Sequence, residues 1–453
     1  MLETMAMDVN MISVLIFVLC GSLAGILAGL NPSVNISISI LMFYPLLSSI
    51  DVYSLIAFYI GILITSQYMG SVIASTVGIP GEASSIPAVK EGYAMNIQGR
   101  LTEALRTSAI SSAVGSVVAV IAIITTITYI SYLHVFYALT LQLLLLGGCI
   151  VISVITSSNK FIVNCCLMGT GYLLGTAGIT QIHNTTWFTE MFDVTNVYFM
   201  AGIPTTVAFI FLYALPTLFG NKFNDDGEMI VAKQDSGKFS ITEFKWISAI
   251  RGSCIGFFAG FIPSLTFTIS SQLAYSYEKW IKRKVYKKGD ASCLSAAEAA
   301  NNSASLSFLI PLLAFGIPIS ASEILVYDMA VNSGAQFGLE WFNNINITYA
   351  LVMSFIIANV IGLVSAWPLA TLINDFVYKH NNKIFWVALV MLGATIINMG
   401  MEEYQLWYYL LLSGFLLPVA WFIRKLDCIP LIFGFMLSIH FQEVLTHFLQ
   451  IYL

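Results

Sequence analysis

The 53 residues from Thr107 to Asn159 contain no Asp, Glu, Lys or Arg. A membrane-spanning helix needs about 20 predominantly apolar residues, so a run of this length has room for two crossings. The whole chain is similar in character, with 58% apolar residues, 9% charged residues and a mean hydropathy of +0.84. Soluble domains carry about 25% charged residues. The sequence therefore predicts an all-α polytopic membrane protein.

Uncharged runs of helix length form two series of about seven membrane segments each. The first series lies near residues 11–30, 36–50, 52–76, 107–130, 135–156, 161–180 and 196–219. The second lies near residues 246–262, 264–278, 303–315, 345–374, 384–399, 404–423 and 428–449. The polar stretch 220–245 between them predicts a cytoplasmic linker. This division gives a first membrane repeat over 1–219 and a second over 246–453.

The basic residues indicate the orientation of the chain in the membrane, because Lys and Arg are retained in cytoplasmic loops. When alternate loops are assigned to opposite sides, one set holds all 19 Lys and Arg residues and the other set holds none. The basic set includes six residues between Lys279 and Lys288, whereas the other set holds acids such as Asp51 and Glu190. We therefore expect a multi-pass membrane protein with both termini outside the cytoplasm.

Two motifs occur twice, in the same order. Residues 21–40 (GSLAGILAGLNPSVNISISI) and residues 252–271 (GSCIGFFAGFIPSLTFTISS) are identical at nine of twenty positions when aligned at an offset of 231. GIPGEASSI at 78–86 and GIPISASEI at 316–324 agree at six of nine. The loops that follow equivalent motifs belong to opposite sets, one basic and one without bases. Equivalent loops on opposite sides predict two inverted-topology repeats, an arrangement typical of secondary transporters.

Each glycine-rich stretch is interrupted by Pro-Ser, where a spanning helix would be expected to continue. Proline disrupts the helical hydrogen-bond ladder, and unwound backbone at membrane depth survives only inside protein or along a polar cavity. We expect discontinuous or re-entrant helices here, with substrate-binding groups at Pro32, Ser33, Asn35, Pro263, Ser264 and Thr266. The alternative is a packing kink. For the glycines themselves, at positions 21, 25 and 29, close helix packing is the favoured interpretation.

The two GIP motifs are interpreted as helix starts whose free N–H groups face a cavity. The substrate-binding residues predicted here are Gly78, Pro80, Gly81, Ser84, Ser85, Gly316, Pro318 and Ser320. Glu82 is predicted to bind a cation, although it could instead complement the helix dipole. Ser320 and Glu323 also fit the S-x-x-E capping box.

A third polar cluster lies in SAAEAANNSAS. Glu298, Asn301 and Asn302 are three and four residues apart, so on a helix they share one face and can offer oxygens to a small cation, for which Na⁺ is the expected metal ion. The alternative is a polar helix end at the membrane interface. Ionisable groups inside a membrane are nevertheless functional candidates by default.

Several classes of protein are disfavoured by what the sequence lacks. It has no HExxH motif and no Walker-type glycine loop, and Ser33, Ser84 and Ser264 have no His nearby in the sequence. We therefore expect no enzyme, no cofactor and no nucleic-acid partner. Because all bases lie in loops, an anionic substrate would be held by helix N-termini, by Ser, Thr and Asn groups, and by a co-bound cation. Such a site favours cation-coupled symport.

The strings GIPGEASSIPAVKEGYAMNIQGRLTEAL, GSCIGFFAGFIPSLT and AAEAANNSASLSFLIPLLAFGIP resemble the large membrane subunit of the tripartite tricarboxylate transporters. The resemblance implies a transporter that imports small carboxylate anions by alternating access, driven by a Na⁺ or H⁺ gradient. It also implies two partners, a small membrane subunit and a periplasmic solute-binding protein.

The chain departs from the family pattern at its motifs. Pro-Ser stands where Pro-Gly is usual after each glycine-rich stretch, and Ile319 replaces the glycine that follows the second GIP. A substrate other than citrate is consistent with these changes. Two alternatives remain at this stage, an ion channel and a transporter of a non-carboxylate solute.

Overall fold

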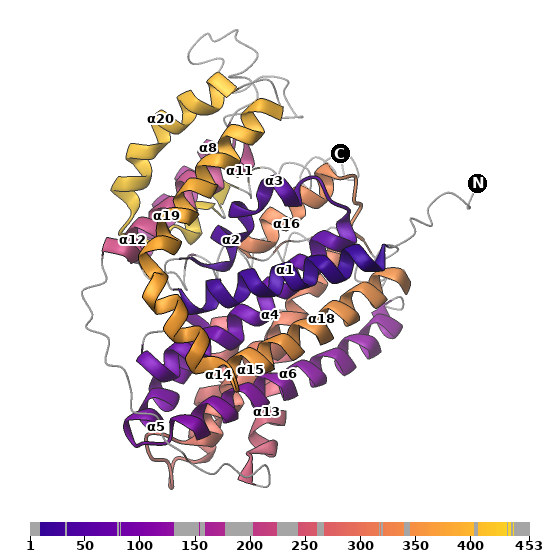
Figure 1. Cartoon of the computed structure of the whole chain (residues 1–453), viewed down its shortest axis with the longest axis vertical. Coiled ribbons are helices and arrows are strands. Elements are labelled where there is room, and N and C mark those ends of the chain that lie inside the picture. Colours follow the sequence, from indigo (N-terminus) through magenta and orange to yellow (C-terminus); the bar gives the residue numbers. More distant parts are fainter. Residues whose placement is uncertain are drawn as a thin grey trace.

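The computed structural model describes residues 10–31, 34–78, 81, 83–130, 154, 159–176, 203–223, 243–260, 267–316, 318, 320–338, 345–402, 406–432, 434, 435 and 438. Every regular element in these ranges is helical (Figure 1). The first half contains α1 (Met11–Leu30), α2 (Ile36–Met42), α3 (Tyr44–Leu47), α4 (Val52–Val77), the 3₁₀ turn η1 (Ala83–Ser85), the π-helical η2 (Ala88–Gly92), α5 (Tyr93–Ile97), α6 (Leu101–Ile130), α8 (Phe161–Gly175), α11 (Thr205–Phe209), the π-helical η4 (Ile210–Ala214) and α12 (Leu215–Phe223). The second half contains α13 (Trp246–Gly260), α14 (Phe267–Ile281), α15 (Ala291–Phe315), α16 (Ala321–Asn332), α18 (Ile345–Ala366), α19 (Ala370–Glu402) and α20 (Leu406–Ile423).

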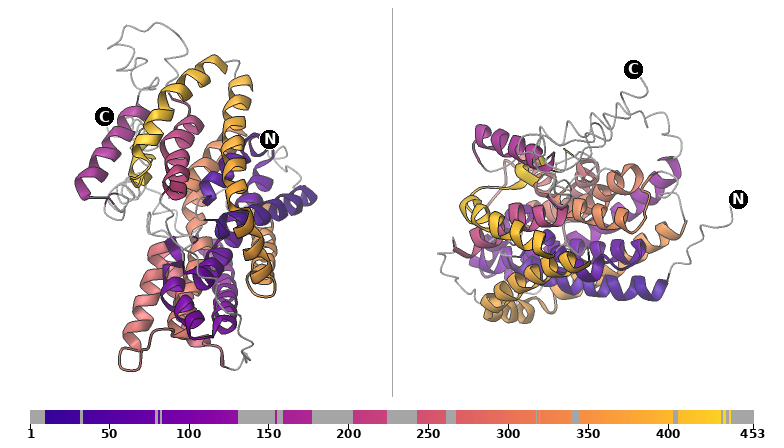
Figure 2. Two further views of the ribbon diagram at one scale, coloured as in Figure 1. Left: turned by 60° about the vertical axis from the view of Figure 1, so that its left-hand side comes forward. Right: turned by 90° about the horizontal axis from the view of Figure 1, so that it is seen from above.

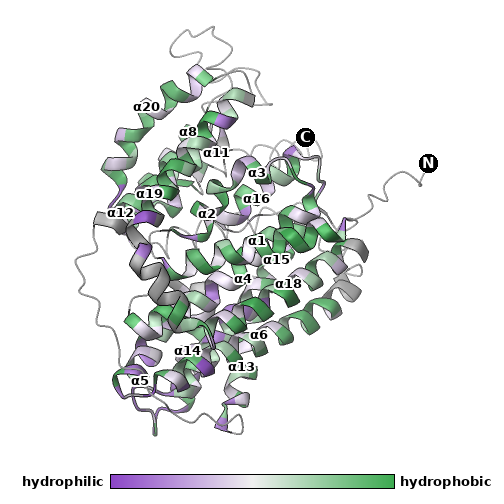
Figure 3. Cartoon of the chain, in the orientation of Figure 1, coloured by the Kyte–Doolittle hydropathy of each residue, from purple (hydrophilic) through white to green (hydrophobic). Residues whose placement is uncertain are grey.

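Five of the described helices are long and apolar enough to cross a membrane. They are Met11–Leu30, Val52–Val77, Leu101–Thr125, Ile347–Ala366 and Leu406–Ile423. The Val52–Val77 helix, α4, is buried along its whole apolar window and so forms the centre of the bundle. Outer helices expose large apolar side chains such as Leu23 and Phe422, and green residues cover their outward faces in Figure 3. Apolar surface on this scale is typical of lipid contact, so the chain is a multi-pass membrane protein.

Some predicted segments differ from the observed helices. The segment predicted at 36–50 is not one helix, because α2 ends at Met42 and α3 is a single turn with Pro45 in its first positions. The segment predicted at 303–315 is the second half of α15, which begins at Ala291 because the Asp290 side chain caps the helix there. The segment predicted at 135–156 and most of that at 428–449 lie outside the described residues. So does most of the linker 220–245, although α12 continues to Phe223.

The glycine-rich helices α1 and α13 pack in the same way on the two long helices α4 and α15. A Cβ atom at any of the six glycines would approach a backbone carbonyl of the partner helix within 2.7 Å, so only glycine permits the contact. The contacts join Gly21 to Phe58, Gly25 to Ile62 and Gly29 to Ser66 in the first pair, and Gly252 to Ala296, Gly256 to Ala300 and Gly260 to Ala304 in the second. The partner positions are all 238 residues apart. The packing interpretation of the glycines is confirmed.

The same pairs of residues also give the direction of the helices. Residue numbers rise together along α1 and α4, and along α13 and α15, so each pair is parallel. Where α4 meets α15 the order is reversed, because Gln67 bonds to Ser305 whereas Ser71 bonds to Glu298. The two long helices therefore run in opposite directions at the centre of the molecule.

The remaining helices divide between this central bundle and a second group. In the bundle, α6 packs on α15 and α18 packs on α4. In Figures 1 and 2, α8, α11, α12 and α20 lie together at one end, away from the glycine-rich pairs. Contacts of α20 with η4 and with α12 link the members of this second group, and α19 connects the group to the bundle.

Candidate functional site

The predicted site residues fall into two sets, those that the structure describes and those that it does not. Outside the described residues lie Pro32, Ser33, Pro80, Glu82, Pro263, Ser264 and Thr266. The helices nevertheless end beside both Pro-Ser positions. Helix α1 ends at Leu30 and α2 begins at Ile36, whereas α13 ends at Gly260 and α14 begins at Phe267.

Helix α15 buries a polar face in the centre of the bundle. Glu298 and Asn301 are each 1% exposed and Asn302 is fully buried, so these residues do not form an interfacial helix end. At roughly 100° per residue, the three side chains and Ser305 fall within an arc of about 100° on the helix. Glycine-rich helix α13 packs on the opposite side of α15, against Ala300. The polar face is thus turned away from α13 and toward α4 and α6.

Two other helices supply hydroxyl groups to the Glu298 carboxylate. Ser71 of α4 donates a hydrogen bond of 2.6 Å to Oε2, and Ser108 of α6 is a second side-chain partner. Among the described residues, no Lys or Arg contacts this carboxylate. A buried carboxylate is costly unless it is protonated, hydrogen-bonded or paired with a cation. A carboxylate in the position of Glu298 can therefore exchange a proton or bind a metal cation.

The amides beside Glu298 are buried without hydrogen-bond partners. Both side-chain polar atoms of Asn301, and both of Asn302, lack a partner among the described residues, as does Oε1 of Gln67. An amide buried in this way costs about 1–3 kcal/mol per unmade hydrogen bond. Asn301 and Asn302 lie on α15 between Glu298 and Ser305, the two positions that bond to α4. We call Gln67, Ser71, Glu298, Asn301, Asn302 and Ser305 the polar seam.

The seam continues toward α18. Asn359 accepts hydrogen bonds at its Oδ1 from the Tyr68 hydroxyl at 3.0 Å and from the Ser116 hydroxyl at 2.5 Å. The sequence did not single out Gln67, Ser71 or Asn359, because each is an uncharged polar residue within a segment of membrane-spanning length. A signal was nevertheless present: Gln67 and Ser71 are four apart and share a helix face.

Asn35 has a structural role in the described part of the chain. Its Oδ1 accepts a hydrogen bond of 2.9 Å from the backbone N–H of Ile38, so Asn35 is the N-cap of α2. Its Nδ2 donates to the Tyr213 hydroxyl at 3.4 Å. Capping explains why a polar residue stands here, and substrate binding by Asn35 stays a prediction.

The first GIP motif lies between the end of one helix and the start of the next. Gly78 is the C-cap of α4 with φ +81°, a left-handed conformation that favours glycine. Helical structure begins again at Ala83 with a 3₁₀ turn that contains the buried residues Ser84 and Ser85, and it continues through η2 and α5 to Ile97. A Cβ atom on Gly81 would lie 2.2 Å from the Gly29 carbonyl oxygen, so close packing accounts for the glycine there. The motif therefore ends α4 and precedes a helix start, and substrate binding by its residues stays a prediction.

The second GIP motif combines a helix end with a true helix start. Gly316 is the C-cap of α15 with φ +65°, and Pro318 is buried. Ser320 is the N-cap of α16, accepting a hydrogen bond of 3.1 Å from the backbone N–H of Glu323. The capping role of Ser320 is therefore confirmed. Substrate binding by Ser320 stays a prediction.

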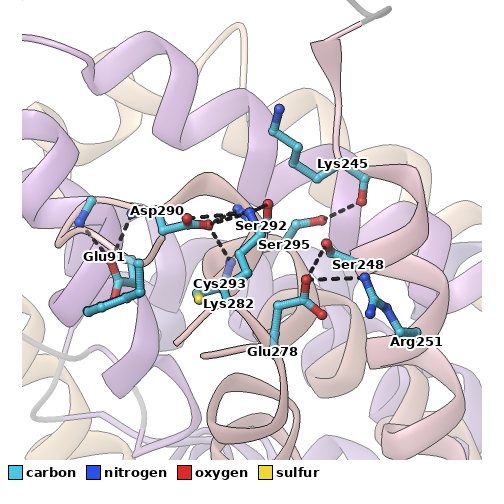
Figure 4. Close-up of polar contacts among 12 residues, drawn as sticks. Glu91, Lys245, Ser248, Arg251, Glu278, Lys282, Asp290, Ser292, Cys293 and Ser295 are labelled. Carbon is cyan, nitrogen blue, oxygen red and sulfur yellow. Dashed lines mark hydrogen bonds and ion pairs between the residues drawn. The ribbon is translucent and has the colours of Figure 1, made fainter. Parts of the chain in front are cut away.

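The segment of residues 88–100, which contains η2 and α5, and the loop of residues 282–290 hold the two halves together at one end of the molecule. The buried carboxylate of Glu91 accepts hydrogen bonds of 2.7 and 2.9 Å from the backbone N–H groups of Gly289 and Asp290 (Figure 4). It also accepts hydrogen bonds from the hydroxyls of Tyr275, at 2.9 Å, and Tyr286, at 2.7 Å. Burial, and then the hydrogen bond to Glu91, raise the pKa of Tyr286 to about 12. Asp290 is in turn the N-cap of α15, so Glu91 fixes the start of the helix that carries the polar seam.

We expect Glu91→Ala to lower the stability of the protein by about 3 kcal/mol. The change leaves the buried N–H group of Gly289 and the buried hydroxyl of Tyr275 without their acceptor, and each such loss costs about 1–3 kcal/mol. The half-buried donors of Asp290 and Tyr286 can bond to water instead and cost less. Thermal unfolding of the purified protein measures the effect. The control is Glu103→Ala, which removes an exposed ion pair with Arg100. Equal melting temperatures for the two variants would contradict a stabilising role for Glu91.

Comparison with known proteins gives the family. The model of the tripartite tricarboxylate transporter TctA family matches residues 15–432. The chain belongs to this family. It is also similar to an Agrobacterium vitis protein described as "Uncharacterized 52.8 kDa protein in TAR-I ttuC' 3'region", with 24% identity over 391 residues that cover 84% of this chain and 76% of the relative. No solved structure matches significantly.

Membership of the TctA family accounts for the buried polar groups of an otherwise apolar bundle. The family is one of transporters, so the chain is a membrane component of a tricarboxylate transporter. In the described part of the chain, no group of three or more His, Cys, Asp or Glu could hold a metal ion. The polar seam instead offers one carboxylate with amides and hydroxyls. Such groups suit small anions and monovalent cations better than transition metals.

Proposed function

We propose that this TctA-family chain is an ion-gradient-driven secondary transporter that imports small carboxylate anions of the dicarboxylate and tricarboxylate class by alternating access. It would act in the bacterial inner membrane, with both termini outside the cytoplasm. A small membrane subunit and a periplasmic solute-binding protein would be its partners. The observation that carries the proposal is the set of buried amides without partners, at Asn301 and Asn302, where the two halves of the chain meet.

The proposed architecture is a pair of inverted-topology repeats. It is supported by the identical packing of α1 on α4 and of α13 on α15, together with the opposite directions of α4 and α15. Transporters with such repeats bind substrate and coupling ion near the bilayer midplane, at the interface between the repeats. In this chain the polar seam lies at that interface.

The proposed binding mode follows from the charges in the seam. No base contacts Glu298 among the described residues, so a carboxylate substrate beside it needs a compensating positive charge. A cation held by Glu298, Asn301 and Asn302 would supply it, and Glu82 is proposed as a further cation ligand. Amide N–H groups and hydroxyls, including the predicted groups of the Pro-Ser and GIP motifs, would then orient the anion. The coupling ion is proposed to be Na⁺ or H⁺.

We expect one class of carboxylate to raise the melting temperature of the purified protein, and to do so only when the coupling ion is present. A ligand that binds the folded state stabilises it by mass action, by about 2.7 kcal/mol at a concentration of 100 Kd. Mono-, di- and tricarboxylates are compared with and without sodium at two pH values. Absence of a shift for every carboxylate, both alone and with reconstituted partners, would reject carboxylate transport and favour a non-carboxylate solute.

A further inference from the structure

We propose that Gln67 of α4 completes a Na⁺ site with Glu298, Asn301 and Asn302 of α15, on the pseudo-two-fold axis between the two repeats. The proposal rests on the proposed function and adds to it a ligand from the first half of the chain. Because both halves contribute ligands, binding of the ion would depend on how the halves are arranged.

The orientation of the Gln67 amide is fixed by its neighbour. Ser305 donates its hydroxyl proton to the backbone carbonyl of Asn301 at 3.0 Å. Its oxygen is therefore an acceptor for Gln67, which must present Nε2 to it, as observed. The other amide atom, Oε1, is a buried acceptor without a partner among the described residues. An acceptor of this kind is satisfied by a donor hydrogen or by a cation.

The other oxygens of the proposed site lie on the facing side of α15. Two hydrogen bonds join α4 to α15, one from Ser71 to Glu298 and one from Gln67 to Ser305. Glu298 and Ser305 are two helical turns apart on α15. Asn301 and Asn302 lie between these two bonds, and both are buried with their amide atoms unpaired. One carboxylate and three buried amides thus lie on the faces of α4 and α15 that these two bonds join. A single negative charge among neutral oxygens balances a monovalent cation and leaves a divalent one uncompensated.

The bond between Gln67 and Ser305 also locates the pseudo-symmetry axis. These residues are 238 positions apart, which is the offset that relates Gly78 to Gly316 and Phe58 to Ala296. In a two-fold arrangement, a residue contacts its own counterpart only at the axis. The Gln67 amide therefore lies at the axis, where the two repeats meet.

We expect Gln67→Leu to raise the sodium concentration for half-maximal thermal stabilisation at least tenfold, because one oxygen ligand is lost. The melting temperature of the purified protein is measured over a series of NaCl concentrations, with choline chloride keeping the ionic strength constant and KCl as a comparison. The control is Gln98→Leu, the same substitution at a glutamine that bonds to the Lys288 carbonyl far from the seam. This variant should keep the wild-type sodium midpoint, even if its melting temperature falls.

A second variant tests the site if Gln67→Leu does not fold. Gln67→Glu places a second carboxylate beside Glu298, so we expect it to gain stabilisation by Ca²⁺ that the wild type lacks. An unchanged sodium midpoint in Gln67→Leu would overturn the proposal. So would a Gln67→Glu protein that does not respond to Ca²⁺, or a wild-type protein with equal melting temperatures in NaCl, KCl and choline chloride. Each of these outcomes leaves carboxylate binding to be decided separately, by the anion series described above.

Discussion

Gly256→Ala is expected to prevent the native packing of α13 on α15. The added Cβ atom would lie 2.2 Å from the Ala300 carbonyl oxygen and 2.6 Å from its Cα, and real Cβ atoms essentially never approach backbone so closely. A flexible side chain could move aside, but these atoms belong to the backbone of a buried helix. The two helices must therefore separate along the whole contact. We expect a loss of at least about 3 kcal/mol, the upper end of the usual cost of overpacking.

The effect of Gly256→Ala is measured as the yield of monodisperse protein in detergent and as its melting temperature. Gly414→Ala in α20 is the matched control, because nothing lies within 4 Å of a Cβ atom there. At that position alanine should be tolerated, and its higher helix propensity favours it by about 1 kcal/mol. Wild-type yield and melting temperature for Gly256→Ala would show that α13 does not pack on α15 in this way.

Glu298→Gln is expected to abolish the dependence of substrate binding and transport on the coupling ion. Glutamine has nearly the same shape, and its carbonyl oxygen can still accept from Ser71, so the substitution removes the charge and preserves the packing. Without the carboxylate, the seam has only neutral oxygens with which to hold a cation. We expect at least a hundredfold loss of apparent ion affinity, equivalent to about 2.8 kcal/mol.

The measurement for Glu298→Gln is uptake into proteoliposomes, with sodium and pH gradients imposed separately. The matched control is Glu278→Gln, the same change at a fully buried carboxylate that bonds to Ser248 and Arg251 outside the seam (Figure 4). This control should lose stability but keep its ion dependence. Wild-type ion dependence in Glu298→Gln would remove Glu298 from the ion site. Asn302→Ala gives an independent test of the same face of α15.

The repeated glycines, the helix caps and the interruption of the glycine-rich stretches could be predicted because each depends on residues close together in the sequence. Glycines at every fourth position define a helix stripe, and S-x-x-E defines a cap. The α15 face was predicted for the same reason, since Glu298 and Asn302 are one turn apart. These features follow from the chain's local geometry.

The part of the polar seam that lies on α4 could not be predicted, because it depends on contacts between residues far apart in the sequence. Gln67 and Ser71 stand in an apolar helix, and their significance comes from Ser305 and Glu298, more than 220 residues away. The extent of the helices was missed for a related reason. Serines, Glu298 and two asparagines lower the hydropathy of the first half of α15, yet packing against α6 and α13 supports a helix there. In the same way, the sequence around Glu91 gives no sign of its role, because the fold alone brings its four hydrogen-bond donors to it.

The glycines of α1 contact α4 at positions equivalent to those at which the glycines of α13 contact α15, and this correspondence bears on the evolution of the chain. Helix pairs that pack at equivalent positions are the pattern expected if one coding segment was duplicated. From Gly29 to Ser66 the chain advances 37 residues, whereas from Gly260 to Ala304 it advances 44, so the connection between the paired helices is seven residues longer in the second half. That connection holds Gly289 and Asp290, whose N–H groups bond to Glu91. The longer connection of the second half is thus the segment that bonds to Glu91 of the first half.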